Sequence, residues 1–123
     1  MVEPHRIIAN VEPATTVNLN NGNWYYNYDI QTETVVTSKE VEEYKEETQY
    51  NYIQIKLSEK PTYSLCVEAL IREYVSQSQE FDLINAANKD ILAGKTTSDN
   101  IAKYKDYLSK VEEIKKKVKE SFS

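Results

Sequence analysis

The sequence predicts an α+β fold, in which a small antiparallel β-meander is followed by three helices, the last of them long. Hydrophobic residues recur with a period of two up to about residue 57, and with a period of about 3.6 after it. The strand-like segments precede the helix-like segments and do not alternate with them, which is typical of α+β proteins. The chain of 123 residues is close to the commonest domain size. We therefore predict a single domain over 1–123, with a β part at 1–58 and a helical part at 59–123.

A β-hairpin is the clearest local structure in the β part. Two alternating segments, 15–20 and 23–30, flank an Asn-Gly dipeptide at 21–22. Asn-Gly favours a two-residue type I′ turn, because both central residues of that turn need positive φ. Such a turn pairs Leu19 with Trp24. Most of the aromatic side chains that follow then lie on the core face of the hairpin.

Three further segments have the pattern of strands. The first lies at 5–11, another at 32–37, and the last at 49–57. The last segment alternates aliphatic residues with tyrosines and polar residues, so its aliphatic side is expected to face the core and its tyrosines the wetter side.

Two features of the β part are candidate partner-binding sites. Glu42 and Glu43 lie in an acidic segment at 38–48, which is either a charged connection that protects a sheet edge or an acidic binding motif. The aromatic side chains at 24–28 either form part of the core or provide a surface on which a ligand ring stacks. Tyr25 is the one that is expected on the face away from the core.

The helical part carries clear start and stop signals. Pro61 suits the first turn of a helix that extends to about Tyr74. A second helix is expected from about Gln77 to Ala93, with Ser76 and Gln79 as a capping box and Gly94 as the residue that ends it.

The third helix is expected from about Asp99 to Ser121, after a Ser98 N-cap. Its apolar residues recur at alternating spacings of three and four, which is the pattern of a heptad seam broken at Lys115. This helix either packs on the rest of the domain or binds a partner or a second copy. The candidate partner-binding residues of its seam are Tyr104, Leu108, Val111 and Val118.

The period of each segment also predicts the core. Residues on the apolar face of a strand or helix are expected to be buried. These are Trp24, Tyr26, Ile30, Ile53, Ile55, Leu57, Val67, Leu70, Ile71, Phe81, Ile84 and Ile91.

Composition excludes several kinds of function. The net charge of −5 arises in the first sixty residues, which argues against nucleic acid as a partner, because phosphate contacts need excess Lys and Arg. One cysteine, Cys66, and one histidine, His5, are too few for a zinc site, and two glycines do not make a phosphate-binding loop. We predict no catalytic, cofactor-binding or metal-binding residues, no cofactor, and no enzymatic activity.

The apolar segments are too short to cross a bilayer, and the first residues lack the basic and apolar regions of a signal peptide. We therefore expect no membrane partner and no secretion by a signal peptide.

From residue 50 onward the order of features resembles small proteins encoded in bacteriophage and prophage structural-gene regions, beside tail and tail-fibre genes. A strand with a Tyr-x-Tyr pattern at 50–52 leads into a helix that contains Leu-Ile-Arg-Glu-Tyr at 70–74. A Ser-capped helix and a lysine-rich last helix then follow. The chain departs from the pattern by one inserted residue before Ser76.

The resemblance implies a phage-associated structural or assembly protein, either a minor virion component or a tail-fibre assembly factor or adaptor. Its expected partners are other phage structural proteins or a second copy of itself. Its expected location is the host cytoplasm during assembly, with the virion as the alternative. The rival hypothesis is an acidic regulatory or inhibitory module that binds a host protein.

Overall fold

The computed structural model describes residues 1–36 and 46–122 and confirms the α+β class. The chain forms two compact units. The β unit comprises Pro4–Thr62. The helical unit comprises Met1–Glu3 together with the chain from Tyr63 onward. The boundary therefore lies close to the position at which the hydrophobic period changes.

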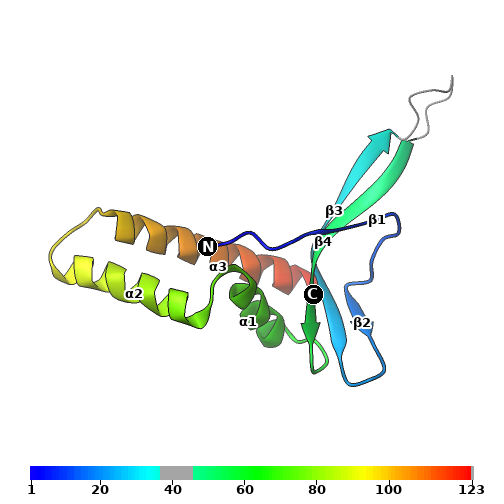
Figure 1. Cartoon of the computed structure of the whole chain (residues 1–123), viewed down its shortest axis with the longest axis horizontal. Helices are drawn as coiled ribbons and strands as arrows, with labels where there is room; N and C mark the ends of the chain where they lie inside the picture. Colours follow the sequence, from blue (N-terminus) through cyan, green and yellow to red (C-terminus); the bar gives the residue numbers. More distant parts are fainter. Residues whose placement is uncertain (37–45, 123) are drawn as a thin grey trace. The chain divides into compact units, whose positions relative to one another are not determined.

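The β unit is a four-stranded antiparallel sheet with the strand order β1-β4-β3-β2. Its strands are β1 (Ile7–Ala9), β2 (Thr16–Asn18), β3 (Trp24–Val36) and β4 (Glu46–Leu57). Strands β2, β3 and β4 form the predicted meander, and β1 pairs with the outer edge of β4. The two central strands continue together past both edge strands (Figure 1).

The connection between β2 and β3 is one residue longer than predicted. Asn18 lies opposite Trp24, and the N–H of Leu19 donates to the carbonyl of Asn23 at 3.0 Å. The predicted pairing of Leu19 with Trp24 is therefore wrong, and the loop consists of residues 20–22.

The conformation of Asn20 explains the longer loop. Asn20 adopts φ 61°, and its N–H donates to the side-chain oxygen of Asn18 at 2.9 Å. Asn tolerates this left-handed region better than most residues, and Asx turns of this kind compete with a two-residue turn. Gly22 also has positive φ, so the Asn-Gly signal located the turn correctly but not its length.

The segment predicted as a separate third strand is the second half of β3. A β-bulge between Tyr28 and Gln31 interrupts the register with β4, and Asp29 within it has φ 53°. A bulge shifts the alternation of side chains by one residue. One bulged strand therefore looks like two separate strands in the sequence.

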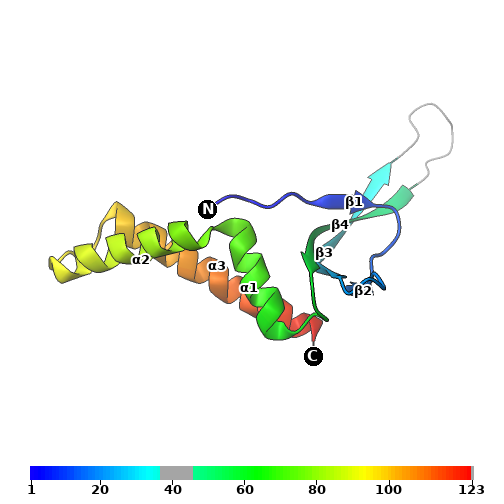
Figure 2. The ribbon, with the colours of Figure 1, turned by 60° about the horizontal axis from the view of Figure 1, so that its bottom comes forward.

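The helical unit contains α1 (Tyr63–Tyr74), α2 (Gln77–Leu92) and α3 (Asp99–Ser121), and both shorter helices pack against α3 (Figure 2). The capping box of Ser76 and Gln79 is confirmed, with both of its hydrogen bonds present. Ser98 caps α3 by accepting the N–H of Ile101 at 3.1 Å. Gly94, just after α2, has φ 81° as predicted.

The predicted core is partly correct. Five of its members are buried, namely Tyr26, Ile53, Ile55, Val67 and Leu70. Five are half-buried, namely Trp24, Ile30, Leu57, Ile71 and Ile84. The prediction is wrong for Phe81 and Ile91, which are 55% and 51% exposed. Tyr52, which was expected on the wetter side of β4, is also buried.

Candidate protein-binding surface

Helix α2 has two apolar stripes, and only one of them is buried. Ala87 is fully buried and Leu83 is half-buried on the side that packs against α3. Phe81, Ile91 and Leu92 lie on a different side, and Leu92 is 87% exposed. The small side chain of Ala87 allows a close approach of the two helices. The side chains of Phe81, Ile91 and Leu92 remain outside this contact.

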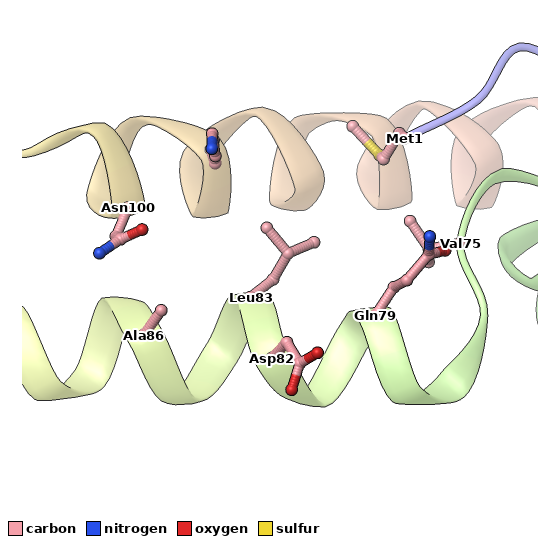
Figure 3. A pocket seen from close by; sticks show the side chains of 8 residues that line it. Met1, Val75, Gln79, Asp82, Leu83, Ala86 and Asn100 are labelled. Carbon is pink, nitrogen blue, oxygen red and sulfur yellow. The ribbon is translucent and has the colours of Figure 1, made fainter.

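An open groove of about 360 Å³ runs along one flank of α2 and α3 (Figure 3). Leu83 points from α2 toward α3 within it. The other residues that line the groove are Met1, Val75, Gln79, Asp82, Ala86, Asn100 and Lys103. Only Asp82 and Lys103 among these have ionisable side chains, and both are exposed. The groove therefore presents no buried acid or base.

The exposed apolar residues lie on the opposite flank of the same two helices. Successive side chains of a helix are rotated by about 100° about its axis. On α2, one side of the stripe that faces α3 carries the groove residues Gln79, Asp82 and Ala86. The other side carries Phe81 and Ile91. By the same rotation, Lys103 and Leu108 lie on opposite sides of the stripe of α3 that faces α2. Because the groove occupies one flank of both helices, Leu108 and Tyr104 lie on the flank of Phe81. We define the outer α2–α3 face as Phe81, Ile84, Asn88, Ile91 and Leu92 of α2 with Tyr104 and Leu108 of α3.

Two of the predicted partner-binding residues of the last helix therefore belong to this face. Leu108 is 43% exposed, and the half-buried ring of Tyr104 stacks on Tyr107 with ring centres 6.4 Å apart. Val111 is half-buried. Val118 is fully buried, so it is a core residue of the helical unit and does not present a surface to a partner.

The predicted partner-binding residues of the β part are not brought together with these. Tyr25 is half-buried on β3, where it lies opposite Val17 of β2 and Lys56 of β4. Glu42 and Glu43 lie outside the described residues.

A cluster of polar residues joins the three helices beside the outer face. Glu80 of α2 accepts a hydrogen bond from the hydroxyl of Tyr107 of α3, and another from Arg72 of α1 at 3.1 Å. The hydrogen bond from Tyr107 lowers the pKa of Glu80, and Arg72 lowers it further. Burial raises the pKa of Tyr107 to about 12, with a further contribution from Glu80. Glu80 is therefore ionised and Tyr107 protonated at neutral pH.

The single cysteine lies in the core of the helical unit. Cys66 of α1 is fully buried, and burial raises the pKa of its thiol to about 12. The reactive thiolate is therefore almost absent at neutral pH. Across residues 1–36 and 46–122, no three side chains of His, Cys, Asp or Glu gather where they could hold a metal ion.

Arg6 makes the main polar cluster of the β unit. Its guanidinium donates to the side-chain oxygen of Asn51 and to the backbone oxygen of Asp29, both at 2.6 Å. It also donates to the carboxylate of Asp29 and to the backbone oxygen of Asn51, both at 3.2 Å. These bonds fix the β3 bulge against β4. Arg6 is not among the residues predicted from the sequence. Its only signal there is a charged side chain within an otherwise apolar first strand.

No helix in the described part of the chain is long and apolar enough to cross a membrane. Comparison of the chain with protein-family models, with curated proteins and with solved structures finds no match.

Proposed function

We propose that the chain is an accessory structural or assembly protein that acts by binding other proteins through the outer α2–α3 face. The observation that carries this proposal is the exposure of Phe81, Ile91 and Leu92 by half or more on one helix. Large apolar side chains that cluster on a surface mark sites of protein interaction, whereas single exposed ones need no explanation.

A second copy of the chain is the partner that fits this face best. Phe81, Ile84, Asn88 and Ile91 follow one another at spacings of three, four and three, which is the spacing of a coiled-coil seam. An Asn within such a seam is a known means of fixing register and oligomeric state. The seam carries no charged residue, so two copies can meet there without repulsion between like charges.

The biological setting follows from the resemblance of residues 50 onward to proteins encoded beside phage tail and tail-fibre genes. We propose a role in the phage particle or in its assembly, with phage structural proteins as further partners. The acidic regulatory module is the alternative, and it would depend on Glu42 and Glu43 and not on the outer α2–α3 face.

Light scattering tests the proposal on the parent protein alone and mixed with the structural proteins encoded beside its gene. The test variant is Phe81→Ser with Ile91→Ser. The control is Ile8→Ser with Val11→Ser, which replaces two side chains of the β unit that are 64% and 77% exposed. We expect the parent and the control to form dimers or larger complexes, and the test variant to remain a monomer.

Two results would contradict the proposal. One is a parent protein that is monomeric and binds none of the structural proteins. The other is an equal loss of association in the control variant. Association that is lost in Glu42→Gln with Glu43→Gln, but kept in the test variant, would support the regulatory alternative.

A further inference from the structure

The two central strands of the sheet extend beyond their neighbours as a ribbon. We call Gln31–Val36 of β3 and Glu46–Gln49 of β4 the β-arm. On β3, β2 pairs only with Trp24–Tyr26, and on β4, β1 pairs only with Tyr50–Tyr52. In the described part of the chain, neither outer edge of the β-arm has a neighbouring strand (Figure 1).

An unpaired strand edge presents backbone N–H and C=O groups that another strand can bond. A two-stranded ribbon is also only marginally stable in water, and a third strand stabilises it. The β-arm is therefore suited to accept an additional strand, which is how several peptide-binding domains capture extended segments.

The β3 side of the β-arm has the composition of a pairing edge. Thr32, Thr34, Val35 and Val36 are β-branched, and such residues favour extended strands. Residues 31–36 contain neither the proline nor the lysine with which many proteins block an open edge. Residues 31–34 are exposed, so an added strand could reach this edge.

The charge of the β-arm indicates the chemistry of the strand that would bind. Glu33, Glu46 and Glu47 are exposed, and the described residues of the β-arm include no Lys or Arg. Glu33 lies opposite Gln49 and Glu47 lies opposite Val35, so the two carboxylates share one face as diagonal neighbours. Diagonal neighbours are about 7–8 Å apart in a sheet. No ion pair joins either carboxylate to a residue within 1–36 or 46–122.

We propose that the edge of β3 at Gln31–Val36 binds an extended segment of a different protein, with Lys or Arg at alternate positions, as an additional β-strand. Alternate positions of a strand point to the same face, so the cations would lie beside Glu33 and Glu47. A second copy of the β-arm fits less well, because it would bring glutamates against glutamates. This site is separate from the outer α2–α3 face and does not depend on it.

The four hydrogen bonds from Arg6 support this role by fixing the base of the β-arm. They hold Asp29 at the bulge and Asn51 of β4 together where the β-arm begins. Bulges bend and twist a strand locally. The bulge therefore sets the direction of the β-arm, and Arg6 keeps that direction constant.

The test uses the full chain labelled with ¹⁵N and two synthetic ten-residue peptides. One peptide alternates lysine with valine and threonine, and the other has glutamate in place of lysine. Amide chemical shifts locate the binding site, and titration gives the affinity. The test variant is Glu33→Gln with Glu47→Gln. The control is Glu68→Gln with Glu73→Gln, which removes the same charge from exposed positions of α1.

We expect the lysine peptide to shift the amides of residues 31–36 and to protect them from exchange. The affinity should fall at least tenfold in the test variant and stay within twofold of the parent in the control. It should also fall as salt is raised, because the attraction is electrostatic.

Three results would overturn the proposal. The first is equal binding of the glutamate peptide. The second is equal affinity of the test variant and the parent. The third is a set of shifts at residues 31–36 that depends on protein concentration without any peptide, which would identify a second copy as the occupant.

Discussion

The hydroxyl of Tyr107 provides a quantitative test of how the three helices are held together. The substitution Tyr107→Phe removes only this hydroxyl and leaves the ring in place. Glu80 then loses its hydrogen bond from α3 and keeps the bond from Arg72. The difference in the free energy of unfolding between the parent and Tyr107→Phe therefore measures the contribution of this one hydrogen bond between α2 and α3.

The expected loss follows from the environment of Glu80. A hydrogen bond to a charged group contributes about 1.5–3 kcal/mol. The side chain of Glu80 is 17% exposed and keeps one partner, so water and Arg72 compensate part of the loss. We expect Tyr107→Phe to lower the free energy of unfolding by about 1.5 kcal/mol. With a urea m-value of about 1–3 kcal/mol/M, the midpoint should fall by about 0.5–1.5 M.

The dependence of this loss on pH has a definite sign. The folded-state pKa of Glu80 lies below its unfolded value, so the contribution of Glu80 is complete above that value and disappears as the pH falls through the folded pKa. The pKa of Tyr107 is raised to about 12, so its contribution disappears as the pH rises from about 10 to about 12. The difference between parent and variant should therefore be largest from pH 5 to 9.

Urea unfolding followed by circular dichroism at 222 nm measures these differences. Tyr104→Phe is the matched control, because no hydrogen bond joins its hydroxyl to another described residue. Its free energy of unfolding should stay within about 0.5 kcal/mol of that of the parent. Equal midpoints for the parent and Tyr107→Phe at pH 7 would refute the assigned role of Glu80. A difference that does not shrink as the pH is lowered from 5 to the acid unfolding of the parent would refute the role of its charge.

Two further substitutions test the two units separately. Leu70→Asp places an unpaired carboxylate at a fully buried site of α1 and should cost about 4 kcal/mol or more. Val11→Asp, at a 77% exposed site outside the outer α2–α3 face, should cost less than about 0.5 kcal/mol. Equal urea midpoints for the two variants would mean that the buried face of α1 is misassigned. Arg6→Gln removes the hydrogen bonds at the bulge and should lower the free energy of unfolding by about 1–2 kcal/mol. Unfolding followed by Trp24 fluorescence measures this loss, with Lys56→Gln as the control at an exposed position. Equal stability of the two variants would show that the bulge is stable without Arg6.

Signals confined to a few neighbouring residues were predicted well from the sequence. The capping box of Ser76 and Gln79 and the stop at Gly94 were placed correctly, because each depends on local backbone geometry. The Asn-Gly signal located the turn but not its length, because Asn20 takes positive φ as well. The register between β2 and β3 therefore depends on the backbone conformation of Asn20, which the hydrophobic pattern does not reveal.

The α2 residues of the candidate surface could not be assigned from the sequence, because α2 has two apolar stripes. Periodicity predicts which residues share a face, but it does not tell which face packs against a neighbour. The pairing of α2 with α3 buries Ala87 and exposes Phe81 and Ile91. Leu108 was predicted as a partner-binding residue from its heptad spacing and is 43% exposed. Its role in binding stays a prediction.

Cross-linking at Asn88 tests most directly whether the outer α2–α3 face binds a second copy. Asn88→Cys places a thiol in the exposed seam, and Lys103→Cys places one on the opposite flank as the control. The native Cys66 is fully buried with a thiol pKa of about 12, so it does not react with a bis-maleimide at neutral pH. We predict that Asn88→Cys is converted to a covalent dimer at low micromolar concentration and that Lys103→Cys is not. Equal yields from the two variants, or no dimer from either, would contradict the account.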